Sequence, residues 1–147
     1  MQGETRKAFH YTIKAKAESI FATAILKRTA IGVHEPEKPI LWFSTHPLLD
    51  PTAYKAINEA GVIRRVRFDQ MVELGLFRFG VDRAHLLHWT RLWRAARMTR
   101  KTAEALAETG IEQGADPLQW FGSLVDIPLD ETVSIEVYQN DEWKTLN

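Results

Sequence analysis

Residues 9–13 have the sequence Phe-His-Tyr-Thr-Ile, in which large apolar side chains alternate with polar ones. This alternation predicts a β-strand with one apolar face and one polar face. The polar face carries the imidazole of His10 and the hydroxyl of Thr12. The strand therefore combines a side that can pack in a core with a side that can bind a ligand.

Residues 39–45, Pro-Ile-Leu-Trp-Phe-Ser-Thr, predict a second and mostly buried strand, on which Trp42 and Ser44 share one face. Polar groups on sheet faces flanked by large apolar residues suit a flat aromatic ligand with a few oriented polar atoms. The same spacing also fits a core tryptophan and a buried histidine whose nitrogen atoms are satisfied by main-chain carbonyls.

The rest of the chain mixes helical and strand patterns without regular βαβ alternation, which predicts an α+β fold. Asp50 before Pro51 predicts one helix start, and Thr99 predicts another. The expected helices cover residues 16–27, 51–60, 85–97 and 99–112. The further strands cover residues 75–81, 118–127 and 132–138, with a short extended piece around Trp143. A loop with two prolines is expected at residues 34–39.

The 147 residues fit a single domain spanning residues 1–147, and 45% of them are hydrophobic, as in soluble globular proteins. No apolar run approaches the roughly 18 residues that a membrane span needs, and the N-terminal sequence lacks the apolar centre of a signal peptide. A cytoplasmic protein is expected. Cysteine is absent, which excludes disulfides, thiol catalysis and cysteine-ligated metal centres.

The net charge is zero, but the charges are unevenly distributed. Residues 61–100 carry 9 basic and 3 acidic side chains, whereas residues 101–147 carry 2 basic and 10 acidic ones. Arginine clusters suit phosphate oxygens, but the basic middle can equally pair with the acidic C-terminal third. The pI of about 7.0 argues against strong non-specific binding of nucleic acid.

Several familiar sites lack their residues. The sequence has no P-loop, no Rossmann glycine motif, no Gly-x-Ser-x-Gly elbow and no His-Glu-x-x-His zinc helix. His85 and His88 lie three residues apart, but no third ligand is near them, so no metal site is predicted. Paired carboxylates for glycoside chemistry cannot be identified, because the acidic residues are scattered.

The order of a His-Tyr-Thr strand, a helix, a proline-containing loop and an Ile-Leu-Trp-Phe-Ser strand resembles the first half of the ADP-ribosyltransferase-like superfamily, of the diphtheria-toxin and poly-ADP-ribose-polymerase type. The blocks His-Tyr-Thr, Trp-Phe-Ser, Phe-Arg-Phe-Gly and Gln-Trp-Phe-x-Ser are also similar to those of a bacterial and phage-borne branch. The resemblance implies two small packed β-sheets with flanking helices. It further implies a His, Tyr, Glu signature spread over three strands.

Transferred to this sequence, the family histidine matches His10, which is then expected to hold a ribose hydroxyl of NAD. Thr12 is expected to line the nicotinamide site. Trp42 takes the place of the tyrosine that stacks on nicotinamide, a change that keeps a π-face. Ser44 follows on the same strand face.

The third signature position departs from the family, because the nearest counterpart of the glutamate is Gln119. Gln119 is expected to share a strand face with Ser123, and it cannot act as a base. Glu131, expected to begin the next strand, is an alternative, whereas Glu136 is expected to lie at an exposed position. Arg78 is expected to contact the pyrophosphate of NAD.

The resemblance implies an NAD-dependent ADP-ribosyltransferase or NAD glycohydrolase that uses NAD as substrate, needs no metal or membrane, and acts on a protein or nucleic-acid acceptor. Gln119 or Glu131 would orient the reacting sugar. The alternative is a non-catalytic relative that binds a nucleotide or a partner and lacks the glutamate. A third hypothesis is an enzyme that processes RNA ends and uses the arginine-rich segment to contact the RNA.

Overall fold

A computed structural model describes residues 6–30 and 32–146, so residues 1–5, 31 and 147 of the expected domain lie outside the description. The described part is an α+β fold. Its helices are α2 (Lys14–Thr23), α3 (Phe68–Glu73), α4 (Trp89–Ala95) and α5 (Arg100–Glu112). Its main strands are β1 (Lys7–Ile13), β3 (Leu41–Ser44), β6 (Leu76–Asp82), β7 (Leu87–His88), β8 (Trp120–Ser123), β10 (Ser134–Gln139) and β11 (Glu142–Thr145).

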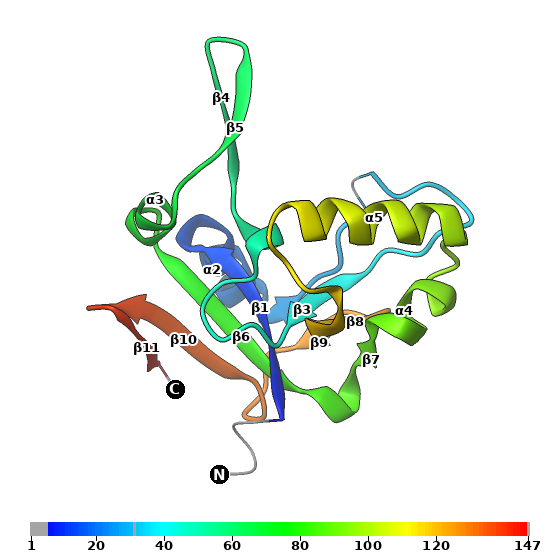
Figure 1. Cartoon of the computed structure of the whole chain (residues 1–147). Coiled ribbons are helices and arrows are strands. Elements are labelled where there is room, and N and C mark those ends of the chain that lie inside the picture. The colour runs from blue at the N-terminus through cyan, green and yellow to red at the C-terminus, as the bar shows by residue number, and fades with distance from the viewer. Residues whose placement is uncertain (1–5, 31, 147) are drawn as a thin grey trace.

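These strands form one seven-stranded antiparallel sheet in the order β11-β10-β6-β1-β3-β8-β7 (Figure 1). Two separate two-stranded sheets complete the described part. One pairs β2 (Ile25–Leu26) with β9 (Ile127–Pro128), and the other pairs β4 (Ala56–Glu59) with β5 (Val62–Arg65).

The seven-stranded sheet is weakly joined at its centre. Strand β1 pairs with β6 along its whole length, from Lys7 to Ile13, but pairs with β3 at the single position Phe9–Ser44. The sheet is thus a four-stranded half and a three-stranded half that separate beyond this pair. The two small packed sheets implied by the resemblance are replaced by this one sheet.

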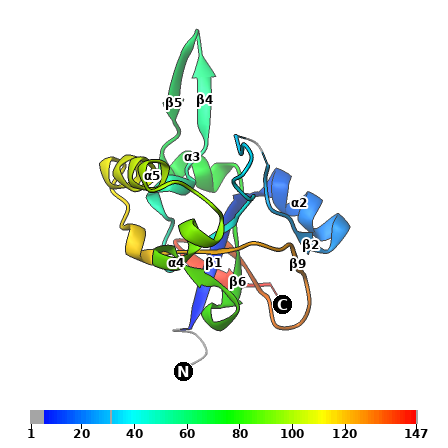
Figure 2. The ribbon, with the colours of Figure 1, turned by 90° about the vertical axis from the view of Figure 1, so that its right-hand side faces the viewer.

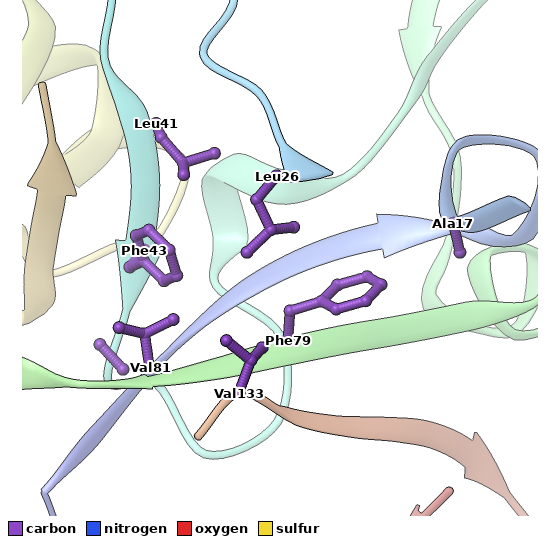
Figure 3. Close-up of a cluster of buried hydrophobic side chains, with 8 residues drawn as sticks. Ala17, Leu26, Leu41, Phe43, Phe79, Val81 and Val133 are labelled. Atoms are coloured by element: carbon purple, nitrogen blue, oxygen red, sulfur yellow. The ribbon is translucent and has the colours of Figure 1, made fainter. Parts of the chain in front are cut away.

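Three apolar clusters hold the halves and helices together. Figure 3 shows the first, where Phe79 of the sheet meets Leu26 of β2 and Ala17 of α2, all fully buried. Burying each large side chain contributes roughly 1.5–3 kcal/mol. The second cluster lies under α4 and α5 around Trp89 and Leu92, and Figure 2 shows α5 and α2 on opposite sides of the sheet. The third contains Tyr11, Leu49, Val66, Met71 and Leu76.

The alternating or continuous apolar strands predicted at residues 9–13, 39–45, 75–81 and 132–138 are confirmed, as is the extended piece around Trp143. The helix expected at residues 99–112 is present as α5. The helix expected at residues 16–27 is present as α2, but it ends at Thr23, because Ala24 adopts the left-handed conformation and Ile25–Leu26 form strand β2. Thr99 caps α5, its hydroxyl accepting from the amide of Thr102 at 3.1 Å. The short helix α3 was not expected.

The helix expected at residues 51–60 is wrong. Asp50 does accept from the amide of Thr52 at 2.9 Å, but the helix is one 3₁₀ turn, Pro51–Ala53. The chain then forms the β4–β5 hairpin, which projects away from the sheet in Figures 1 and 2. Ala60 and Gly61 at its tip have φ of 53° and 85°, the left-handed pair that a tight hairpin turn requires.

Two further elements are shorter than expected. The helix predicted at residues 85–97 begins only at Trp89, because residues 83–85 form a 3₁₀ turn and β7 follows it. The strand predicted at residues 118–127 begins at Trp120, after a 3₁₀ turn over Pro117–Gln119, and is interrupted before β9.

His88 caps α4 and its Nε2 lies 2.8 Å from the carbonyl oxygen of Leu118, so His85 and His88 do not share a helix face. Among the described residues, no group of three potential ligands gathers closely enough to hold a metal. The described helices are also too short or too polar to cross a bilayer.

Candidate functional site

A cavity of about 480 Å³ lies between α5 and strands β1 and β3. This volume falls in the usual range of small-molecule sites. Its walls combine apolar groups with His10, Ser44 and Asp50, while α5 contributes Gly110 and its C-cap contributes Gln113. The cavity therefore brings polar side chains of two separate strands to one apolar hollow.

A second cavity of about 290 Å³ adjoins the first and has Thr12 in its wall. The two cavities share His10, Tyr11, Trp42 and Ala53. The single β1–β3 pair joins Phe9 to Ser44. His10, Tyr11 and Trp42 lie just beyond this pair, where the two halves of the sheet separate. The separation of the strands thus creates a two-part cleft, and His10 and Trp42 line both of its parts.

The second cavity is positively charged. Lys16 and Lys27 lie at its exposed rim and the half-buried Lys55 completes the group. None of the three forms an ion pair with a described residue. Three ammonium groups around one hollow favour an anionic ligand such as a phosphate.

His10 is held by main-chain chemistry. Its Nδ1 lies 2.8 Å from the main-chain oxygen of Trp42. A carbonyl oxygen can only accept, so Nδ1 carries the proton and Nε2 of the neutral ring is an acceptor. Burial lowers the pKa of His10 below its usual 6.5, and the charge of Lys16 lowers it further, although the bond to Trp42 opposes them. The ring is therefore neutral at pH 7.

Trp42 belongs to a cluster of three indoles. Its ring centroid lies 6.0 Å from that of Trp89 and 6.1 Å from that of Trp120, yet its side chain is only half-buried. The cluster holds one wall of the cleft rigid while leaving part of the Trp42 ring open to a ligand. Trp120 reaches this place because Gly110 of α5 has no side chain to obstruct it.

Asp50 is a site residue that the sequence analysis treated only as a helix cap. It is 2% exposed, and it is the one carboxylate among the residues that line either cavity. Its Oδ2 accepts from the Ser44 hydroxyl at 2.6 Å, and its Oδ1 accepts from the Thr52 hydroxyl at 2.6 Å. The Thr52 amide donates a third hydrogen bond to the Asp50 carboxylate. Burial and these three hydrogen bonds mark Asp50 as a candidate site residue, and neither can be read from the sequence.

Tyr11 supports the site from the apolar side of β1. Its hydroxyl donates to the main-chain oxygen of His46. Burial raises the pKa of Tyr11 to about 12, with Arg78 opposing the shift. The phenol is therefore a neutral donor that anchors the loop after β3.

Arg78 lies outside both cavity walls. It is buried, its Nε donates to Glu136, and its Nη1 donates to the Pro47 carbonyl at 2.9 Å. The guanidinium also lies 3.8 Å from the ring centre of Phe9 and 4.4 Å from that of Trp143. Glu136, expected to be exposed, is instead mostly covered by this pairing.

The residues proposed for the third signature position are not brought to the cleft. Gln119 ends a 3₁₀ turn and therefore does not share a strand with Ser123, whose hydroxyl donates to Val125 at 2.7 Å. Glu131 is exposed in the turn before β10 rather than at its start. None of the three lines either cavity.

The structure thus brings together four predicted residues, His10, Thr12, Trp42 and Ser44, and adds Asp50. An acceptor nitrogen, an open aromatic face, a buried carboxylate and a cationic hollow can together bind a nucleotide. Comparison with protein-family models, with curated proteins and with solved structures finds no match to this chain.

Proposed function

We propose that this chain has an ADP-ribosyltransferase-like fold and binds NAD in the two-part cleft, where it releases nicotinamide from the ribose. The observation that carries the proposal is that His10 and Trp42 line both cavities, at the boundary between them. These residues come from the two strands on which the sequence resemblance rests.

The cleft offers a complementary group for each part of NAD. The half-open ring of Trp42 provides a π-face for nicotinamide. Nε2 of neutral His10 accepts a hydrogen bond from a ribose hydroxyl. The lysines of the second cavity, Lys16, Lys27 and Lys55, balance the charge of the pyrophosphate.

The reaction breaks the bond between ribose C1′ and the nicotinamide nitrogen. Nicotinamide leaves as a neutral molecule with the bonding electron pair, and positive charge develops on the ribose. A carboxylate in a poorly solvated site stabilises such a cation, and we assign that role to Asp50, the buried carboxylate that lines the first cavity. Water or an acceptor nucleophile then bonds to C1′ and gives up its proton to solvent water.

The test is incubation of the purified chain with NAD labelled in the adenylate moiety, in the presence and absence of a cell extract. Nicotinamide release with or without transfer of label is expected. Lys16→Ala should raise the concentration of NAD needed, whereas Lys14→Ala, an exposed lysine outside both cavities, should leave it unchanged. Neither release nor transfer under any of these conditions would contradict the catalytic part of the proposal.

A second candidate, a non-catalytic nucleotide-binding protein, is favoured by one observation. Asp50 already accepts three hydrogen bonds from Ser44 and Thr52, and Gln119 and Glu131 lie outside the cleft. Calorimetric titration separates the two candidates. Binding of NAD or ADP-ribose without turnover identifies this second function, and binding of neither contradicts both.

A further inference from the structure

Part of the basic middle of the chain lies on α4, the loop after it and the start of α5. From residue 83 to residue 103 the sequence contains six arginines and lysines and no acidic residue. Five of these cations are exposed, on the segment that buries Trp89, Leu92 and Ala103 in the second apolar cluster. We call this surface the α4 patch, and it consists of Arg91, Arg94, Arg97, Arg100 and Lys101.

The acidic C-terminal third does not neutralise this patch. Within the described residues, none of its five cations forms an ion pair. One ion pair between the basic middle and the C-terminal third, Arg78 with Glu136, lies in the sheet. Glu104 follows in α5 but makes no ion pair with Arg100 or Lys101. The charges of the patch therefore face solvent uncompensated.

An aromatic ring lies among these cations. The guanidinium of Arg94 is 4.5 Å from the ring centre of Trp93, and that of Arg100 is 5.7 Å from it. Trp93 is half-buried, so part of its ring is accessible. Arginines without an ion-pair partner, which can contact a phosphate backbone, together with a ring on which a base can stack, are the features of surfaces that bind single-stranded nucleic acid.

We propose that the α4 patch binds single-stranded nucleic acid. A membrane surface fits less well, because membrane-binding helices place large apolar side chains beside their cations and none between residues 83 and 103 is exposed. The neutral pI does not oppose the proposal, since the compensating acidic charge lies elsewhere in the chain.

The patch is also close to the cleft. Helix α5 begins within the patch at Arg100 and contributes Gly110 to the wall of the first cavity, about 15 Å further along the helix axis. A single-stranded nucleic acid bound to the patch can therefore extend to the cleft. The proposal does not require NAD, so it and the proposed function can fail separately.

The test is fluorescence anisotropy of a dye-labelled single strand of about 12 nucleotides, as DNA and as RNA, titrated with the full chain at several salt concentrations. Arg91→Gln with Arg94→Gln should weaken binding about tenfold and reduce the slope of log K against log salt by about 1.4, or about 0.7 for each lost phosphate contact. The matched control is Lys14→Gln with Lys144→Gln, which changes the net charge equally. Lys14 follows β1 and Lys144 lies in β11, both in the four-stranded half, so this control should change affinity less than about twofold.

The ring is tested separately. Trp93→Phe keeps a stacking surface and should retain most of the affinity, whereas Trp93→Leu should lose about tenfold, with circular dichroism checking that both variants fold. Equal binding by the patch and control variants would overturn the proposal. Absence of strand binding at about 50 mM salt, or tighter binding to duplex DNA or to anionic phosphatidylserine vesicles, would overturn it as well.

Discussion

Nδ1 of His10 lies 2.8 Å from the main-chain oxygen of Trp42, so a hydrogen bond ties the two strands on which the site depends. It spans the place where β1 and β3 pair at one position only. The bond needs a proton on Nδ1, and it leaves Nε2 an acceptor only while the ring is neutral. The protonation of His10 therefore links the folding of the cleft to its chemistry.

We predict that the free energy of unfolding decreases as the pH falls below about 6.5. The pKa of His10 is lowered in the folded chain, so the unfolded chain takes up this proton at a higher pH than the folded one. The contribution of neutral His10 to the free energy of unfolding is complete above pH 6.5. It is lost as the pH falls toward the pKa of His10 in the folded chain. Urea unfolding between about pH 8 and pH 5 measures it.

The matched variant for this prediction is His10→Gln, whose amide can donate to the Trp42 carbonyl without titrating. Its unfolding free energy should depend less on pH below 6.5 than that of the wild type. The other histidines are the same in both proteins, so any contribution from them cancels in the comparison. The same pH dependence in both proteins would show that His10 is not the responsible group.

We predict that Trp42→Ala weakens NAD binding by about two- to tenfold, because the π-face for nicotinamide is lost. Trp42→Phe should bind nearly as the wild type does. Trp143→Phe, at the β11 edge of the sheet, should leave binding unchanged. The measurement is calorimetric titration with NAD, and equal affinities for Trp42→Ala and Trp42→Phe would exclude stacking.

The site strands could be predicted from the sequence because their signal is local. Residues 9–13 and 39–45 are rich in β-branched and aromatic side chains, which favour strands, and both segments form strands. The sequence could not show that the two strands separate after one pair. Their separation depends on how the helices and the other strands pack, and it creates the cleft.

Two Asp-Pro sequences show where local signals are insufficient. Asp50-Pro51 predicts a helix over residues 51–60, and Asp116-Pro117 comes just before the strand predicted at residues 118–127, yet each forms one capped 3₁₀ turn. In the first case the β4–β5 hairpin follows, with Ala60 rather than the usual asparagine in the left-handed conformation. The capping residue was visible in the sequence, but the length of the helix was not.

We predict that Asp50→Asn destabilises the fold by about 1–3 kcal/mol, because its amide cannot accept every hydrogen bond that the carboxylate accepts from Ser44 and Thr52. Nicotinamide release should also be lost, because the negative charge is removed from the cleft. Glu131→Gln removes an exposed carboxylate outside the cleft and should change neither quantity. Urea unfolding and release of nicotinamide measure the two effects.

We predict that Arg78→Met destabilises the fold by about 3–5 kcal/mol, because it leaves the mostly buried Glu136 without its partner. Arg78→Met with Glu136→Leu should recover most of this loss. The double variant should bind NAD as tightly as the wild type, because Arg78 lines neither cavity. If the double variant is stable but binds NAD more weakly than the wild type, Arg78 does contact the pyrophosphate, as the sequence resemblance implies.

We predict that Gly110→Ala destabilises the fold by about 1–3 kcal/mol, although alanine is normally favoured over glycine inside a helix by about 1 kcal/mol. A Cβ at this position would lie 2.5 Å and 2.6 Å from two ring atoms of Trp120, so the indole must move. Its displacement should change the tryptophan fluorescence and weaken NAD binding, because Trp120 and Gly110 both line the first cavity.

The helix-propensity control is Ala105→Gly, at an exposed position of the same helix, which should cost about 0.5–1 kcal/mol and leave the fluorescence unchanged. Trp120→Phe combined with Gly110→Ala should be more stable than the sum of the two single changes implies, because the smaller ring removes the clash. Additive effects in this cycle would mean that helix α5 yields instead of Trp120, and the cleft wall would then be less rigid than the three-indole cluster suggests.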